Sequence, residues 1–248
     1  MNTHKNIAIF GASGAIGTAF VNAFANHEDN QIYAFSRSHK KFDQENVHSH
    51  QIDIQDETSI EKAIAGACQN TPLDIVIITI GILHQNLNET DETTSFGPEK
   101  SLSDLTAEKF QKLFEINTIG PALIAKHTLP LMNKDKTSIF CALSARIGSI
   151  SDNHLGSWYA YRASKAALNM IIKTASIEMQ RRKYKTIVIG LHPGTVDSQL
   201  SQPFQRSVSK AKLFTPEYSV SKMLNVIENL TPDETGKIFA WDGQEIPY

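Results

Sequence analysis

Two hydrophobic patterns alternate along this chain. Short apolar runs bounded by polar residues predict buried β-strands, and apolar residues that recur every three or four positions predict amphipathic helices. The expected strands span residues 6–10, 31–36, 47–53, 73–80, 137–143, 186–192 and 236–241. The expected helices span residues 15–27, 106–129, 158–180 and 215–230, and one more begins near Asp56. Repeated strand–helix–strand units are typical of a parallel sheet with helices on both faces, so the pattern predicts a doubly wound α/β (Rossmann) fold.

Two of the expected helices carry start signals. Thr215 is followed by Pro216, which suits an N-cap residue and the first helical position. Residues 58–61, TSIE, have the spacing of a capping box. No internal repeat, low-complexity tract or linker interrupts the pattern, so residues 1–248 are expected to form a single domain.

Composition excludes several classes of protein. The 248 residues are 41% hydrophobic, and a net charge of −2 gives no electrostatic reason to bind nucleic acid or an anionic membrane. No apolar stretch approaches the roughly 20 residues that span a bilayer, and the N-terminus has no signal-peptide core, so we expect a cytoplasmic protein.

Cys68 and Cys141 lie in apolar stretches and are expected to be buried free thiols. His48 and His50 face one side of a strand without a third ligand, so no metal site is expected.

A glycine-rich segment follows the first expected strand directly. In GASGAIG, residues 11–17, Gly11, Gly14 and Gly17 stand three positions apart where a strand ends and a helix begins. In dinucleotide sites such glycines permit a tight turn, close approach of the backbone to a pyrophosphate, and close packing of the helix on the sheet. The helix N-terminus also favours an anion. The segment therefore predicts a dinucleotide-binding loop.

The residues after the second strand discriminate between NAD and NADP. Sites that prefer NAD place an acidic residue there, which binds the ribose hydroxyls. The segment AFSRSHKK, residues 34–41, contains no acid, and its Arg37 suits a 2′-phosphate because a guanidinium binds phosphate through two hydrogen bonds. NADP is therefore the expected cofactor. Asp53, at the end of the third strand, either accepts a hydrogen bond from the adenine amino group or caps a loop.

Two tyrosines have a lysine four positions later, a spacing that places both side chains on one helix face. They are Tyr161, with Lys165, and Tyr218, with Lys222. Tyr159, close to the first pair, has Ala163 at that spacing. Spacing alone does not separate the two pairs.

The order of the motifs resembles that of the short-chain dehydrogenase/reductases over the whole chain, and within them the C-factor and sniffer-like carbonyl reductase branch. The resemblance rests on GASGAIG (11–17), FEINTIGP (114–121), SARIGSISDN (144–153), YAYRASKAALNM (159–170) and HPGTVDSQL (192–200). It implies an NADP-dependent oxidoreductase that reduces a carbonyl or oxidises an alcohol on a small molecule. It also implies an Asn–Ser–Tyr–Lys catalytic tetrad and a homo-oligomer, commonly a dimer or tetramer.

Three tetrad positions follow directly from the resemblance. Tyr161 and Lys165 stand where the family keeps its catalytic pair, and Asn117 stands where the family holds a helix distortion and a proton-relaying water. Tyr161 would protonate the carbonyl oxygen as hydride arrives. The cation of Lys165 is expected to lower the pKa of the phenol from its usual value near 10 toward working pH.

The serine is the position at which this chain departs from the family. The usual S-x-x-G arrangement would put the serine at residue 145, which is Ala145, and the nearest hydroxyl belongs to Ser144. Side chains alternate across a strand, so Ser144 reaches the site only if the chain twists or bulges as it leaves the strand. We assign Ser144 to the tetrad, with Ser149 as the alternative. A third possibility is that Tyr161 works without a serine partner.

Other cofactor contacts come from the same resemblance. Backbone groups of Thr195 and Val196, with Ser198 in place of the usual threonine, would orient the nicotinamide carboxamide, and TIG (79–81) stands where the family often has N-A-G. The expected cofactor-contacting residues are Gly11, Ser13, Gly14, Ile16, Gly17, Arg37, Asp53, Ile54, Gly81, Asn117, Tyr161, Lys165, Pro193, Gly194, Thr195, Val196 and Ser198.

A function from another class remains open. The C-factor proteins take their name from cell–cell signalling, so the resemblance also admits a dinucleotide-binding signalling or regulatory protein with incidental turnover. An intact Tyr161–Lys165 pair favours the enzyme. The substrate depends on the loops over residues 83–104 and 198–214. Residues 239–248 either pack at a subunit interface or close the substrate pocket.

Overall fold

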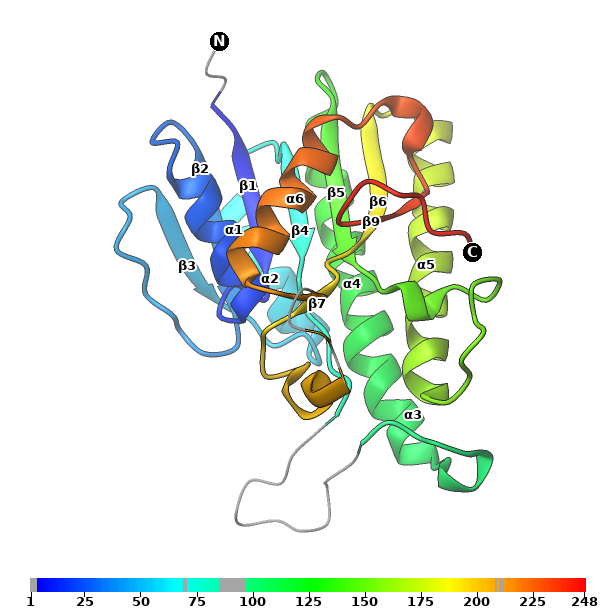
Figure 1. Ribbon diagram of the computed structural model, residues 1–248. Helices are drawn as coiled ribbons and strands as arrows, with labels where there is room; N and C mark the ends of the chain where they lie inside the picture. The colour runs from blue at the N-terminus through cyan, green and yellow to red at the C-terminus, as the bar shows by residue number, and fades with distance from the viewer. Residues whose placement is uncertain (1–3, 69–70, 85–96, 208, 210–211) are drawn as a thin grey trace.

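Seven parallel strands form the central sheet of the computed structural model, which describes residues 4–68, 71–84, 97–207, 209 and 212–248 (Figure 1). In spatial order they are β3 (Val47–Gln51), β2 (Gln31–Ser36), β1 (Asn6–Phe10), β4 (Ile75–Ile78), β5 (Ser138–Leu143), β6 (Thr186–His192) and β9 (Ile238–Ala240). Ile7 of β1 pairs with Ile32 on one side and Ile75 on the other, so the strand order reverses at β1 and β4. In such sheets ligands bind where the order reverses, outside the carboxyl ends of the strands.

All seven expected strands are present, and several are shorter at their ends than the apolar runs suggested. Every residue of β4 is buried, as a strand covered on both faces requires. A second, two-stranded sheet, which the sequence pattern did not predict, joins β7 (Thr195–Val196) to β8 (Leu213–Phe214) in parallel.

Helices cover both faces of the sheet (Figure 1). They are α1 (Ala15–Ala25), α2 (Glu57–Cys68), α3 (Ala107–Phe114), α4 (Gly120–Thr128), α5 (Tyr159–Arg181) and α6 (Pro216–Glu228). α1 and α6 pack together on one face, where Phe20 shares a core with Ile7. α2, α4 and α5 cover the other face, where Leu168 shares a core with Ala8. Consecutive residues of β1 thus enter opposite cores, and the doubly wound fold is confirmed.

The helix expected over residues 106–129 is interrupted. α3 and α4 are joined by a π-helical turn, η3 (Glu115–Ile119), which contains Asn117. A π-turn inserts one extra residue into a helix, and such turns are frequent at functional sites. Here the side chain of Asn117 is fully buried. Hydrophobic periodicity does not detect the turn because helix continues on both sides of it.

One of the two predicted helix-start signals is confirmed and the other is wrong. Thr215 caps α6 as expected, because its hydroxyl accepts the backbone N–H of Tyr218 at 3.2 Å. The TSIE segment does not form a capping box, since α2 has already begun at Glu57. The carboxylate of Asp56 accepts the N–H of Thr58 at 2.9 Å instead. The capping residue therefore lies about half a helical turn before Thr58, and the expected capping box was wrong.

Both cysteines are buried free thiols, as expected. Burial raises the pKa of Cys68 to about 12. Across the described ranges, no helix is both long enough and apolar enough to cross a membrane. Nor does that part of the chain bring together three or more histidine, cysteine, aspartate or glutamate side chains that could hold a metal ion.

The last residues fold back along β9, the edge strand of the sheet. The N–H of Ile246 donates to the carbonyl oxygen of Ile238 at 2.8 Å, and the hydroxyl of Tyr248 donates to the carbonyl oxygen of Gly236. Trp241 packs edge-on against Phe214, with ring centroids 4.7 Å apart. The segment therefore covers an edge that would otherwise present unpaired backbone groups.

Gly17 lies too close to the glycine loop to carry a side chain. A Cβ at residue 17 would lie 2.1 Å from the carbonyl oxygen of Gly11, whereas a Cβ at Gly66 on α2 would meet no atom within 4 Å. We expect Gly17→Ala to lower the free energy of unfolding by about 1–3 kcal/mol or more. We expect Gly66→Ala to raise it by up to about 1 kcal/mol. Urea denaturation of both variants measures the difference, and equal stabilities would contradict it.

Candidate active site

The glycine loop connects the end of β1 to the first turn of α1, at the point where the strand order reverses. Gly11 has a φ of +87°, a left-handed conformation that glycine adopts without strain. Gly14 is the N-cap residue of α1, and no side chain caps that helix end. An uncapped helix N-terminus is suited to an anion. Ser13 is exposed in the same loop, and Ile16 is half-buried. The loop therefore fits a dinucleotide pyrophosphate.

The end of β2 adjoins this loop. The carbonyl oxygen of Phe35 accepts the N–H groups of Gly11 and Ala12 at 2.9 and 3.0 Å. Arg37, two residues later, is exposed, and its guanidinium forms no hydrogen bond or ion pair with another residue of the described ranges. Lys40 already donates to the Thr18 hydroxyl at 2.7 Å. Arg37 therefore remains available to a phosphate, as does the exposed Lys41 further along the loop.

Two of the expected cofactor-contacting residues have contacts of their own. The carboxylate of Asp53 accepts the N–H of Gln55 at 2.9 Å, so Asp53 caps a local turn, one of the two roles that the sequence left open. Ile54 is buried, and a Cβ built at Gly120 would lie 2.9 Å from its Cδ1. Ile54 therefore packs closely against the start of α4.

Burial separates the two tyrosine–lysine pairs. The Nζ of Lys165 lies 6.0 Å from the ring centroid of Tyr161, and that of Lys222 lies 5.6 Å from the ring of Tyr218. Tyr161 is 8% exposed and Lys165 is buried with it, whereas Tyr218 is 43% exposed. Tyr161 and Lys165 lie in the first two turns of α5, where Lys165 donates to the carbonyl oxygen of Leu143, the last residue of β5, at 2.9 Å.

Burial also sets the pKa values of this pair. It raises the pKa of Tyr161 to about 12 and lowers the pKa of Lys165 to about 8. The expected lowering of the phenol pKa by Lys165 is therefore not found in this structure. The phenolate loses more from desolvation than it gains from an ammonium that is directed to a backbone carbonyl. Tyr161 keeps its proton at neutral pH, as a proton donor must.

Asn117 fixes the surroundings of this pair from the π-turn. Its Oδ1 accepts the N–H of Ile82 at 2.8 Å, and its Nδ2 donates to the carbonyl oxygen of Ile82 at 2.9 Å and to the Ser164 hydroxyl at 3.1 Å. A Cβ built at Gly81 would lie 3.4 Å from both Asn117 Oδ1 and Lys165 Nζ. Asn117, Gly81 and Lys165 are therefore brought together as expected.

Thr79 links β4 to β1 beneath the glycine loop. Its hydroxyl donates to the carbonyl oxygen of Phe10 at 2.9 Å and lies 3.2 Å from that of Gly11. A side chain at this position thus joins the two strands at the point where their order reverses. The first residue of the TIG segment, which stands where the family often has N-A-G, thus connects β4 to β1.

The structure does not direct Ser144 toward Tyr161. The Ser144 hydroxyl donates to Oδ1 of Asn169 at 2.5 Å in a buried site, whereas Ala145 packs in a cluster with Tyr161. The alternation of side chains along β5 continues past its end, and no bulge re-aims Ser144. The hydroxyl of Ser149 accepts the N–H of Asp152 at 3.1 Å in its own turn.

A left-handed turn precedes α5, and the sequence did not reveal it. Gly156, Ser157 and Trp158 have φ values of 63°, 51° and 56°. Non-glycine residues in this region cost about 1–3 kcal/mol each and persist where surrounding contacts hold them. Only Gly156 signals such a turn in the sequence.

Two charged residues hold this turn and the start of α5. Glu99 is 1% exposed; its carbonyl oxygen accepts the N–H of Trp158 at 2.6 Å, and its carboxylate accepts that of Ala160 at 3.3 Å. Arg162 donates to the carbonyl oxygens of Gly156 and Ser157, each at 2.8 Å. No feature of the sequence pointed to Glu99, which lies 61 residues before Ala160.

Apolar side chains surround Tyr161. The indole of Trp158 packs edge-on against the Tyr161 ring at 6.3 Å and against Phe204 at 5.0 Å. His84 packs against Phe204 at 5.8 Å, and its Nε2 lies 3.2 Å from the carbonyl oxygen of Leu200. We call the buried residues here and their apolar neighbours the Tyr161 cluster: Leu83, Leu113, Ala145, Ala160, Tyr161, Ile82, Phe110, Ile147, Trp158, Leu200 and Phe204.

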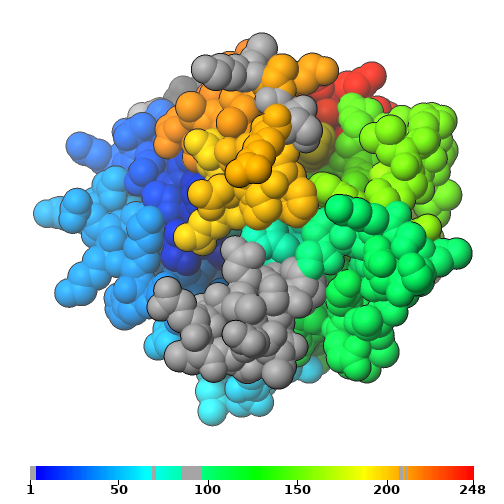
Figure 2. All heavy atoms as spheres, turned by 60° about the horizontal axis from the view of Figure 1, so that its bottom comes forward, coloured from blue at the N-terminus to red at the C-terminus, as the bar shows by residue number. Residues whose placement is uncertain are grey.

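The segment after β6 reaches the same end of the sheet. Pro193 is held by the Ser219 hydroxyl, which donates to its carbonyl oxygen at 2.7 Å, and Gly194 has a φ of +76°. The Ser198 hydroxyl donates to the carbonyl oxygen of Val196 at 3.3 Å. In Figure 2 this segment, in yellow and gold, lies between the blue N-terminal segments and the green middle of the chain. It therefore closes one side of the region that holds the glycine loop and α5.

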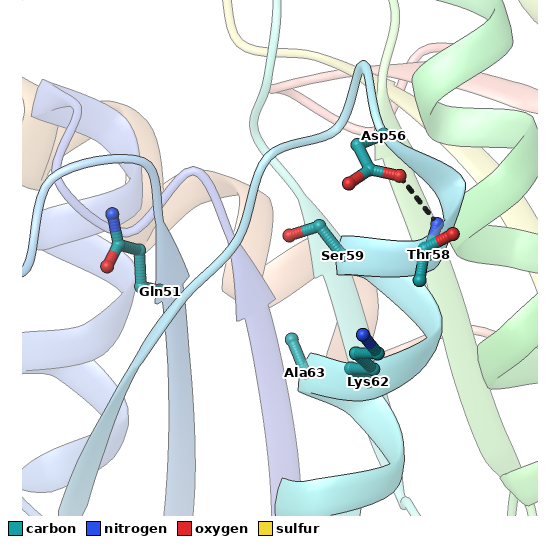
Figure 3. Close-up of a pocket in the computed structure, with 6 residues that line it drawn as sticks. All are labelled: Gln51, Asp56, Thr58, Ser59, Lys62 and Ala63. Atoms are coloured by element: carbon teal, nitrogen blue, oxygen red, sulfur yellow. Dashed lines mark hydrogen bonds between the residues drawn. The ribbon is translucent and has the colours of Figure 1, made fainter.

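A separate hollow lies between β3 and the start of α2 (Figure 3). It is lined by Gln51, Asp56, Thr58, Ser59, Lys62 and Ala63. It is open to solvent, and its polar groups include the Asp56–Thr58 contact that begins α2. None of the residues of the glycine loop or of the Tyr161–Lys165 pair belongs to it, so it is not the candidate site.

The match to a known family is consistent with this arrangement. The model of the short chain dehydrogenase family matches residues 5–208. The chain belongs to this family. The matched residues include the glycine loop, the π-turn and the Tyr161–Lys165 pair.

Two relatives illustrate the breadth of this short-chain dehydrogenase family. An uncharacterized oxidoreductase of Schizosaccharomyces pombe is 29% identical over 273 aligned residues and covers 99% of each chain. The C-signal protein of Myxococcus xanthus is 33% identical over 148 residues, which cover 60% of this chain and 84% of that protein. The resemblance to the C-factor branch is thus confirmed at the level of sequence.

Solved structures share the fold. An NADPH-bound carbonyl reductase from chicken fatty liver has a TM-score of 0.82 at 22% identity and covers 98% of this chain and 99% of its own. The carbonyl reductase Sniffer of Drosophila melanogaster has a TM-score of 0.82 at 20% identity, with coverages of 99% and 100%. At these identities the likeness establishes the Rossmann-like architecture.

Removing the Ser144 hydroxyl tests its placement. Ser144→Ala would leave the buried Oδ1 of Asn169 without its donor, so we expect the free energy of unfolding to fall by about 1–3 kcal/mol. Ser221→Ala, at an exposed position on α6, is the control and should be close to neutral. Chemical denaturation measures both. Wild-type stability for Ser144→Ala would show that the Asn169 contact contributes nothing.

Proposed function

We propose that this protein is an NADP(H)-dependent oxidoreductase that transfers a hydride between nicotinamide and a carbonyl or alcohol on a small molecule, with Tyr161 as the acid/base. The observation that carries the proposal is the buried Tyr161–Lys165 pair on α5, whose lysine lies beside Gly81. A tyrosine–lysine pair at the carboxyl end of a parallel sheet has no structural need to be buried. Proton transfer to a reacting oxygen does require a positioned, protonated phenol.

Each residue has a distinct task in this proposal. A bound NADPH supplies the hydride. Tyr161, protonated at neutral pH, gives its proton to the substrate oxygen. Lys165 keeps a positive charge beside the phenolate that remains and so favours proton release. Asn117 holds the backbone after β4 and the first turns of α5 in register. Ser144 is a structural link to Asn169 in this proposal, so Tyr161 works without that serine.

The cofactor is proposed to be NADP. Arg37 presents a guanidinium at the end of β2, beside the glycine loop, and no acidic residue stands next to it. The carbonyl reductase of chicken fatty liver, which shares the fold, is described as NADPH-bound. The remaining cofactor contacts are proposed as expected from the sequence, through the glycine loop, Gly81, and residues 193–198.

A second function has one observation in its favour. The Myxococcus relative is named C-signal, so a dinucleotide-binding signalling protein with incidental turnover stays a candidate. A sensor needs the dinucleotide but does not need a buried phenol held for proton transfer. Loss of turnover with retained cofactor binding in a Tyr161 variant separates catalytic from sensory use of the site.

We also propose that the protein forms a homo-oligomer. Met170 on α5 is 65% exposed, and Ile177, two turns along the same helix, and Ile119 in the π-turn are also exposed. Exposed apolar side chains on neighbouring helical elements are typical of interaction surfaces. Sedimentation of the purified protein measures its oligomeric state.

The neighbouring tyrosines provide a matched test of the reaction. Tyr161→Phe should lower kcat by about 10²–10⁴-fold, since it removes the proton donor, while the affinity for NADPH is unchanged. Tyr159→Phe, two residues earlier on α5, should keep most of its activity. NADPH oxidation across a panel of aldehydes, ketones and quinones measures both. Full activity in Tyr161→Phe would refute the assignment.

Cofactor choice is tested separately at Arg37. NADPH should bind at least about tenfold more tightly than NADH, a difference of about 1.4 kcal/mol, because the guanidinium pairs with the 2′-phosphate. Arg37→Ala should abolish that preference, whereas Lys41→Ala, at an exposed position in the same loop, should retain most of it. Titration with both cofactors decides the matter, and equal wild-type affinities would be the contrary result.

A further inference from the structure

Glu99 and Arg162 both form hydrogen bonds with the left-handed turn before α5 and with the residues that adjoin it. A buried carboxylate is costly unless it is hydrogen-bonded, and two successive non-glycine residues in the left-handed region are costly as well. Glu99 is buried, one of its carboxylate oxygens lacks a partner among the described residues, and the other binds the first turn of α5. The backbone on both sides of Trp158 is thereby held, because the main-chain carbonyl of Glu99 accepts the N–H of Trp158 and its carboxylate accepts the N–H of Ala160. The indole of Trp158 projects from this held backbone.

The indole stands between the proposed proton donor and the segment after β6. Its ring packs against the rings of both Tyr161 and Phe204. The neighbours of Tyr161 in the cluster, including Leu83 and Ala145, offer apolar surface. The nearby cations, Arg162 and Lys165, both donate to backbone carbonyl oxygens. One carboxylate oxygen of Glu99 lacks a partner among the described residues, and its negative charge would repel a carboxylate on a substrate.

We propose that Trp158 is a specificity-determining residue that packs against the flat, uncharged part of an aromatic aldehyde or ketone, and that Glu99 is the positioning residue that holds it there. The inference rests on the proposed reaction at Tyr161. An aromatic ring gains from offset or edge-on packing with the indole. A carboxylate-bearing substrate would lose its hydration in this cluster without gaining a partner.

The two tryptophans of the chain allow Trp158 to be observed alone. Trp241→Phe leaves Trp158 as the source of indole fluorescence, and Trp158→Phe leaves Trp241. With NADP⁺ bound, 4-nitrobenzaldehyde, which quenches indole emission on contact, should quench Trp158 saturably and leave Trp241 unaffected. Glyoxylate, a small anionic aldehyde, should quench neither. Equal quenching of the two tryptophans, or no saturable quenching of Trp158, overturns the inference.

The role of Glu99 is tested in the Trp241→Phe background. Glu99→Ala should raise about tenfold the concentration of 4-nitrobenzaldehyde that gives half-maximal quenching of Trp158. A change of this size is expected when an aromatic contact is lost. Glu99→Gln keeps an acceptor for the Ala160 N–H and should retain the quenching. Glu108→Ala, at an exposed position on α3, is the control. Unchanged quenching in a folded Glu99→Ala overturns the positioning role.

Kinetics separate this inference from the proposed function. Trp158→Ala should raise KM for 4-nitrobenzaldehyde about tenfold while the NADPH affinity and kcat change little, and Trp158→Phe should stay near wild type. Tyr161→Phe should keep the quenching and lose turnover. If 4-nitrobenzaldehyde quenches Trp158 but the wild-type protein does not reduce it, the proposed function is contradicted and the role of Trp158 is not. If the wild-type protein reduces it without quenching of Trp158, the role of Trp158 is contradicted and the proposed function is not.

Discussion

The side-chain amide of Asn117 joins segments that are far apart in the chain. It pairs with both backbone groups of Ile82, as a neighbouring strand would, and donates to Ser164 on α5. Ser164 immediately precedes Lys165, so the same amide that continues the backbone pairing after β4 also places the ammonium beside Gly81. A buried amide that loses such partners costs about 1–3 kcal/mol. The site therefore depends on the π-turn that directs Asn117 inward.

Burial acts on the two members of the proposed catalytic pair in opposite directions. It disfavours the charged form of each, which raises the pKa of Tyr161 and lowers that of Lys165. The consequence is a phenol that holds its proton and an ammonium whose pKa, about 8, lies close to neutral pH. A donor and a cation in these states are suited to carbonyl reduction, in which the phenol gives up a proton and the lysine favours the resulting anion.

The end of β5 shows how a local rule can prevail over an expectation from resemblance. The family pattern places a serine at residue 145, and the chain has Ala145 there with Ser144 one step earlier. Only a bulge would have carried Ser144 to the Tyr161 side. The strand alternation continues instead, so Ser144 binds Asn169 and Ala145 joins the Tyr161 cluster. An apolar side chain at this position makes that side of the site more apolar.

The sequence by itself determined the alternation of strands and helices, the glycine loop and the absence of an acid beside Arg37, because these depend on periodicity and on residues adjacent in the chain. Spacing did not separate the two tyrosine–lysine pairs, and the distances within them are nearly the same. The order of the motifs did separate them, because Tyr161 and Lys165 stand where the family that the chain resembles keeps its catalytic pair. Only the tertiary structure decided that Tyr161 is buried and Tyr218 exposed. It also decided that the helix distortion implied at Asn117 is a π-turn, and that the main-chain carbonyl of Glu99 binds the N–H of Trp158. Each of these outcomes, like the pKa directions of Tyr161 and Lys165, is set by contacts between residues tens of positions apart. Local sequence patterns contain no information about such contacts.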